Sequence, residues 1–106
     1  MKNMQLPAEK CQTMADVRVA IDALDQEIVG LLAERIRYID AAARIKAERE
    51  AVRDEDRKAE VLANVDRTAR ELNMPADLAA ALYELMVEYS ISYEMTVFDA
   101  KVTVTK

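Results

Sequence analysis

Three cationic side chains lie on two adjacent rows of the stretch 17–46 that are otherwise apolar except for Asp22 and Asp25, and they are the residues of this sequence best suited to chemistry. Read as one helix in steps of four and three residues, the stretch forms an apolar row in which Arg35 is the single charged member. The neighbouring row begins with Arg18 and ends with Lys46. Because an unpaired cation on a buried surface costs free energy, we expect an anionic group to meet these charges.

The spacing of the cations indicates how a ligand would be held. Arg35 and Lys46 are eleven residues apart, so both leave one face of a helix about 16 Å apart along its axis. Two long side chains at that separation can approach a small dianion from its two ends. Arg18 precedes Arg35 by seventeen residues, about 25 Å along the axis, and cannot reach the same ligand from the same helix. In an antiparallel helix pair, Arg18 of one chain can lie over the other chain's Arg35 region, which favours two composite sites per dimer.

Each cation taken singly also fits a simpler interpretation. An Arg or Lys at the edge of an apolar stripe can extend its charged end to solvent or pair with a Glu. The sequence leaves both interpretations open.

A second polar pair, Ser90 and Glu94, lies one helical turn apart beside the apolar Met86 and Tyr93. Ser90 could donate a hydrogen bond to a carboxylate, and a half-buried Glu94 would favour its neutral form and donate as well. The same spacing fits two solvated residues on a helix flank. Neither the cations nor this pair combine a nucleophile with a matched base. We therefore interpret them as a charge-complementary pocket for a small polyanion.

The composition excludes several classes of site and partner. The chain has no His and a single Cys, Cys11, which excludes a zinc site, a Cys–His or Ser–His pair and an intramolecular disulfide. The net charge of −5 makes nucleic acid a poor partner. Residues 1–14 lack a signal-peptide core, and the most apolar stretch, 78–87, is too short to span a bilayer. We expect a cytoplasmic protein that binds neither nucleic acid nor a membrane.

Helices must position these residues. One Gly and two Pro in 106 residues leave little to form hairpins, and 52% hydrophobic with 33% charged residues suits an all-α protein. Predicted helices cover about 14–48, 54–72 and 75–98, and the ends 1–13 and 101–106 are expected to be loose. Thr13 and Asp16 form a capping-box-like start for the first helix. The apolar faces expected on the second and third helices comprise Val61, Leu62, Val65, Ala69 and Leu72, and Leu78, Leu82, Leu85, Met86, Tyr89 and Tyr93.

The first predicted helix would be roughly 50 Å long, which is too long for the core of a lone chain of this size. Its steps of four and three residues are typical of a coiled coil. We therefore predict three helices per chain, the first one long, in an intertwined homodimer. The alternative is an ordinary amphipathic helix in a monomeric bundle.

The order of these residues resembles the all-helical chorismate mutase family over roughly residues 14–98. Ala15–Arg18 and Tyr38–Lys46 also look like the isochorismate-pyruvate lyase branch of the same fold. The segments that carry the family resemblance are Arg18 with Ile21-Asp22 and Leu24-Asp25, Leu31-Leu32-Ala33-Glu34-Arg35, Lys46, Val52-Arg53-Asp54 with Arg57, Leu82-Tyr83, and Ser90 with Glu94.

The resemblance implies one helical domain over residues 1–106, a homodimer with two sites, a small dianionic substrate (chorismate or isochorismate) and no cofactor or metal. In that family, the position of Arg18 is contributed by the partner chain and meets one substrate carboxylate, while the position of Arg35 binds the other. The position of Lys46 donates to the ether oxygen of the breaking bond.

The remaining positions carry supporting roles by the same resemblance. Asp54 would offer contacts near the ring hydroxyl, Arg57 would support the carboxylate end, and Ser90 would sit by the ring carboxylate. Glu94 stands where many relatives carry Gln as the second donor to the ether oxygen.

Two positions depart from the family pattern. Glu94 can donate only when protonated, a form that burial favours and Lys46 opposes, so we expect activity to favour acidic pH if Glu94 contributes. Lys58 stands where mutases usually carry a Glu that binds the ring hydroxyl, and the lyase branch lacks that Glu too. The second departure questions mutase specificity more than the fold.

The expected function is that of a chorismate mutase, which converts chorismate to prephenate by a [3,3] rearrangement. Catalysis would come from holding the compact diaxial substrate and from placing cations beside the ether oxygen. The first alternative is isochorismate-pyruvate lyase, which acts in salicylate formation. The second is a non-enzymatic helical dimerisation module, in which Arg18, Arg35 and Lys46 would pair with acidic side chains and leave no cavity.

Overall fold

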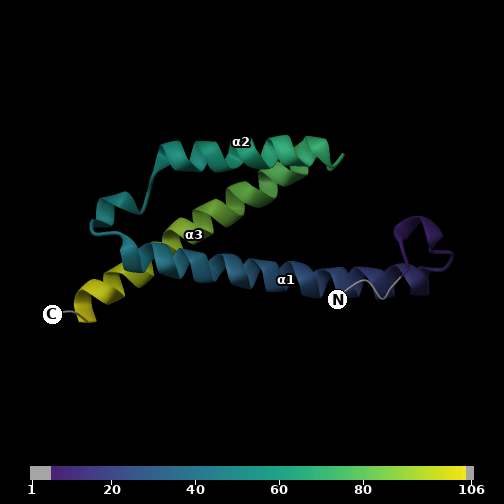
Figure 1. The fold of residues 1–106 in the computed structure, drawn as a ribbon, viewed down its shortest axis with the longest axis horizontal. Helices are drawn as coiled ribbons and strands as arrows, with labels where there is room; N and C mark the ends of the chain where they lie inside the picture. Colours follow the sequence, from purple (N-terminus) through teal and green to yellow (C-terminus); the bar gives the residue numbers. More distant parts are fainter. Residues whose placement is uncertain (1–5, 105–106) are drawn as a thin grey trace. The chain divides into compact units, whose positions relative to one another are not determined.

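The computed structural model describes residues 6–104, with the side chains of 102–104 left out. Every regular element in this range is helical (Figure 1). Three long helices, α1 (Met14–Ile45), α2 (Glu55–Glu71) and α3 (Ala76–Val104), are accompanied by the short 3-10 helices η1 (Ala8–Lys10) and η2 (Arg49–Ala51). The prediction of an all-α chain with a long first helix is confirmed. The chain divides into two compact units inside α1, the first ending at Arg37 and the second beginning at Tyr38.

In the first unit, local hydrogen bonds define the start of α1. Thr13 Oγ1 accepts a hydrogen bond of 3.1 Å from the amide of Asp16. The Asp16 carboxylate in return accepts from the amides of Gln12 at 3.0 Å and Thr13 at 3.3 Å. These hydrogen bonds hold the pKa of Asp16 below its usual value, and the bond from Gln12 has the largest effect. The predicted capping box is confirmed.

In the second unit, both ends of α2 are capped by residues that are local in the sequence. Asp54 has an extended backbone and its carboxylate accepts a 3.0 Å hydrogen bond from the amide of Arg57, so it is the N-cap. At the other end, Asn73 takes the left-handed conformation with φ 59°. The amide of Met74 then donates to the carbonyl of Ala69 at 2.9 Å, and that of Asn73 to Arg70 at 3.3 Å. This Schellman motif reverses the chain, so that α3 runs back along α2 (Figure 1).

Two helix ends differ from the prediction. α1 ends at Ile45 rather than near residue 48, and α3 continues to Val104 rather than ending near 98 with a loose tail from 101. A single tertiary contact explains both differences, because the ammonium of Lys101 binds carbonyls at the end of α1. At the other terminus, residues 1–5 of the predicted loose arm lie outside the described range, and the rest contains η1.

The buried face of α3 lies one residue further along the helix than predicted. Met86 and Tyr93 are half-buried as expected. Four other members of the predicted row are exposed in the single chain: Leu78, Leu82, Leu85 and Tyr89. The row that is buried comprises Ala79, Val87, Ser90, Glu94 and Phe98. The row combines small, polar and apolar side chains, so a search for large apolar residues alone does not find it.

The predicted face of α2 is largely confirmed. Ala69 is buried and three neighbours on the same face, Val61, Leu62 and Val65, are half-buried, whereas Leu72 is 71% exposed. A separate small core joins the end of α1, η2 and the second half of α3 through Ala43, Val52 and Phe98. Between residues 6 and 104, no helix combines the length and the apolar character that a membrane crossing requires.

Candidate active site

Lys46, directly after the last turn of α1, meets Glu94 of α3. The Lys46 Nζ lies 2.8 Å from the Glu94 Oε2. The Glu94 side chain is 6% exposed and that of Lys46 29%. The structure therefore brings together two of the predicted catalytic side chains from segments far apart in the sequence.

The contact between these two groups leaves a hydrogen-bonding position open. Glu94 Oε2 is buried and receives no hydrogen bond from the residues that the structure describes, so the Lys46 contact is an ion pair by distance without hydrogen-bond geometry. A buried carboxyl oxygen without a directed partner is costly. A hydrogen-bond donor of a bound molecule could satisfy it.

Ser90 lies one turn before Glu94 on the same buried row of α3. Both residues are 5% exposed. The alternative interpretation of Ser90 and Glu94 as two solvated residues on a helix flank is therefore wrong. Steps of three and four residues along the row, from Val87 through Ser90 and Glu94 to Phe98, place all four side chains on one helix face.

Tyr93, the neighbour of Glu94, fastens α3 to the last turns of α1. Its hydroxyl donates a 2.6 Å hydrogen bond to the carboxylate of Asp40. This bond, followed by burial, raises the pKa of Tyr93 above its ordinary value. Asp40 was not predicted from the sequence, because nothing local marks a pairing that spans more than fifty residues.

Asp54 and Arg57 lie at the start of α2, where their described contacts are local. The Asp54 carboxylate caps the helix through the amide of Arg57. The guanidinium of Arg57 donates to Glu60 at 2.7 Å and is well exposed. In the single chain these two residues are therefore engaged with their own helix, and their predicted contact with a substrate stays a prediction.

Residues 17–95 match the family model described as chorismate mutase type II. The chain belongs to this family. A curated relative, the isochorismate pyruvate lyase of Pseudomonas aeruginosa, is 33% identical over 87 residues, which cover 82% of this chain and 86% of the relative. The resemblance inferred from the cations and their segments is thus confirmed.

Lys58, which departs from the pattern expected of mutases in this family, is tied to α3 by two carboxylates. Its Nζ lies 2.7 Å from a carboxylate oxygen of Glu88 and 2.9 Å from one of Glu84. Both contacts raise the pKa of Lys58, and the contact with Glu88 has the larger effect. Glu88 also receives two hydrogen bonds from Arg53, at 2.6 and 3.2 Å. Arg53 and then Lys58 lower the pKa of Glu88 to about 2. Glu84 and Glu88 were not predicted from the sequence, because they resemble solvated helix residues.

Arg18 and Arg35 belong to the first unit, on the part of α1 that ends at Arg37. Arg18 is exposed and Arg35 is half-buried. The roles that the family resemblance implies for them stay predictions.

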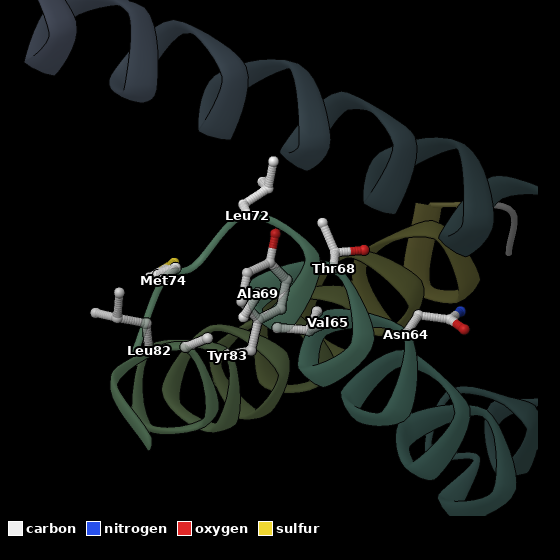
Figure 2. A pocket seen from close by; sticks show the side chains of 9 residues that line it. Asn64, Val65, Thr68, Ala69, Leu72, Met74, Leu82 and Tyr83 are labelled. Atoms are coloured by element: carbon white, nitrogen blue, oxygen red, sulfur yellow. The ribbon is translucent and has the colours of Figure 1, made fainter. Parts of the chain in front are cut away.

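Two described cavities are apolar and do not suit a dianion. One, of about 280 Å³, lies where α2 turns into α3, with the side chain of Tyr83 at the centre of its lining (Figure 2). Tyr83 precedes Glu94 by eleven residues on α3, about 16 Å along the helix. The other, of about 550 Å³, lies between η1 and the start of α1, and Cys11, Val17 and Leu24 contribute to its lining. Neither lining contains a charged side chain, so we place the candidate active site at Lys46 and Glu94.

Proposed function

We propose that this chain is a cofactor-independent chorismate mutase that converts chorismate to prephenate by a [3,3] rearrangement. The observation that carries the proposal is the pairing of Lys46 with a buried Glu94 whose Oε2 lacks a hydrogen-bond donor. A fixed cation, beside a buried carboxyl group that becomes a hydrogen-bond donor when protonated, is suited to an oxygen atom that gains negative charge.

In the proposed mechanism, Lys46 donates to the ether oxygen of the breaking bond. Negative charge develops on that oxygen in the transition state, so an ammonium held in place beforehand stabilises the transition state more than the ground state. A protonated Glu94 is the second donor to the same oxygen. The rearrangement moves no proton between substrate and protein, so no acid–base pair is needed.

The other predicted residues bind and orient the substrate in this proposal. Arg35 binds one carboxylate and Arg18 of a second chain binds the other. Holding both ends of the dianion selects its compact diaxial form. Asp54 near the ring hydroxyl, Arg57 at the carboxylate end and Ser90 by the ring carboxylate complete the site.

We further propose that the 106 residues form one domain of an intertwined homodimer. Apolar side chains that a second copy could cover are exposed on the single chain. They lie on α1, at Ile21, Leu24, Ile28 and Leu31, and on α3, at Leu78, Leu82, Leu85 and Tyr89. A homodimer would bury them and supply Arg18 to the neighbouring site.

Isochorismate-pyruvate lyase is the second candidate, because the curated relative has this activity and because Lys58 is held by Glu84 and Glu88. A lysine in that position cannot accept a hydrogen bond from a ring hydroxyl. The cations proposed for the mutase reaction would also serve the elimination of pyruvate. A non-enzymatic dimerisation module also accounts for the Lys46–Glu94 pair, and an assay with both substrates separates it from the two enzymes.

Incubation of the purified protein with chorismate and, separately, with isochorismate tests these proposals. Prephenate from chorismate supports the mutase, whereas pyruvate and salicylate from isochorismate support the lyase. Lys46→Ala, purified in the same way, controls for contaminating enzymes. If the protein converts neither substrate at millimolar concentration, both enzymatic proposals are wrong.

A further inference from the structure

Lys101, near the end of α3, closes the C-terminal end of α1. Its Nζ donates to the carbonyl of Ala43 at 2.8 Å, to that of Arg44 at 3.3 Å and to that of Lys46 at 2.8 Å. An ammonium has three donors, so this side chain directs all of them at one short backbone segment. The same Nζ lies 4.3 Å from the centroid of the Phe98 ring.

The carbonyls that Lys101 binds are those that a helix end leaves without partners. The last i to i−4 hydrogen bond of α1 runs from the amide of Lys46 to the carbonyl of Ala42 at 3.0 Å. The carbonyls that follow have no partner within the helix. No Gly or Asn follows Ile45 to cap the helix, because the next residues are Lys46, Ala47 and Glu48. The cap is supplied by α3, and its positive charge complements the helix dipole.

One face of α3 contacts both the side chain and the backbone of Lys46. Glu94, Phe98 and Lys101 follow one another in steps of four and three residues, so they share a helix face. Glu94 meets the Lys46 ammonium at 2.8 Å, while Lys101 binds the Lys46 carbonyl. Phe98 packs in the small core with Ala43, one turn before Lys46.

We propose that Lys101 is a positioning residue for Lys46. By fixing the backbone at the end of α1, it sets the place from which the Lys46 side chain extends toward Glu94. Lys101 does not contact the substrate in this proposal. Its consequence for turnover rests on the proposed function, whereas the cap itself rests on the hydrogen bonds alone.

Three variants separate positioning from general stabilisation. Lys101→Met keeps a long unbranched side chain and removes all three donors, whereas Lys101→Arg keeps charge and donors. The matched control is Asp99→Asn, which weakens the pair of hydrogen bonds from Arg49 to Asp99 at 2.8 and 3.2 Å. That pair also ties η2 to the end of α3, but neither member belongs to the cap or to the proposed site.

The first measurement is steady-state turnover of whichever substrate the wild-type protein converts. In Lys101→Met we expect kcat to fall about ten- to a hundredfold with KM within about twofold, since a misplaced donor is felt mainly in the transition state. We expect Lys101→Arg to recover part of the lost kcat and Asp99→Asn to have a kcat near that of the wild-type protein. If Lys101→Met retains the wild-type kcat, the positioning role is wrong.

The second measurement is hydrogen exchange at the amides of Ile45 and Lys46, which needs no substrate. We expect exchange to accelerate roughly tenfold in Lys101→Met and to stay unchanged in Asp99→Asn, because only the former opens the end of α1. Unchanged exchange in a folded Lys101→Met would overturn the cap. If the wild-type protein converts neither substrate, the proposed function fails, and exchange still decides on the cap. Should Lys101→Met not fold, Lys101→Gln takes its place with the same expectations.

Discussion

The ammonium of Lys46 lies 2.8 Å from a carboxyl oxygen of Glu94 that receives no hydrogen bond within the described part of the chain. One group directly follows α1 and the other belongs to α3, and the Glu94 side chain is 6% exposed. Each group gives a separate prediction about catalysis.

Lys46→Ala should nearly abolish turnover. Loss of a donor that stabilises developing charge typically lowers the rate by about 10²–10³. Lys46 lies after the last turn of α1 and outside the small core, so we expect the helical circular dichroism and the dimer mass to be retained. Arg70→Ala, which removes an exposed pair with Asp66 on α2, is the control and should turn over normally. Wild-type turnover in Lys46→Ala would refute the proposed role.

Glu94→Gln should flatten the dependence of the rate on pH. A carboxyl group donates to the ether oxygen only when protonated, so wild-type activity should fall as the pH rises. An amide donates at every pH, so the variant should keep its activity toward neutral pH. The measurement is kcat against pH for both proteins with the same substrate. If the two profiles coincide, Glu94 is not the second donor.

Local features of the fold were predictable, because their hydrogen bonds join residues within four positions. The Thr13–Asp16 box and the Asp54 N-cap are of this kind. The ends of α1 and α3 were predicted wrongly, because Lys101 sets them from more than fifty residues away.

The candidate site was predictable only in part, for a similar reason. Lys46 and Glu94 stand out as charges beside apolar rows, and the family pattern names them. The buried face of α3 was predicted one residue off, because it consists of small and polar residues such as Ala79 and Ser90. Helix periodicity detects large apolar side chains, and four of those on α3, Leu78, Leu82, Leu85 and Tyr89, lie on a face that the single chain leaves exposed.

Glu88 should make the stability of the folded protein fall as the pH is lowered into the acidic range. Arg53 and then Lys58 lower the pKa of Glu88 from 4.5 to about 2 in the folded chain. A carboxylate with a lowered pKa contributes stability that is complete above its unfolded value and is lost as the pH falls toward the folded one. Glu88→Gln should therefore show a smaller loss of the urea midpoint between about pH 4.5 and 2 than the wild-type protein.

Glu71→Gln is the control for the acid dependence, because Glu71 is an exposed carboxylate at the end of α2. Its midpoint should follow the wild-type curve through the same pH range. If the urea midpoint changes with pH equally in Glu88→Gln and the wild-type protein, the network of Glu88 with Arg53 and Lys58 does not contribute to stability.

Gly30→Ala should stabilise α1. An added Cβ at Gly30 would meet nothing within 4 Å in the described structure. Gly in a helix interior is roughly 1 kcal/mol less favourable than Ala, so the melting temperature should rise. Gly30 is exposed on α1 in the single chain. Ala33→Gly, one turn further on, should lower the melting temperature. A decrease in both variants would mean that another surface packs against Gly30.

Mixed dimers of two inactive variants should recover part of the activity. If Arg18 acts across the interface, a dimer of one Arg18→Ala chain and one Lys46→Ala chain contains one intact site and one doubly defective site. Random refolding of an equal mixture makes half of the dimers mixed, so about a quarter of the wild-type activity should return. Arg35→Ala mixed with Lys46→Ala is the matched control. Arg35 and Lys46 serve the same site from one chain in the proposal, so no mixed site would be intact and no activity should return. Recovery in neither mixture would place Arg18 in the site of its own chain, and recovery in both would contradict the proposed division of the site.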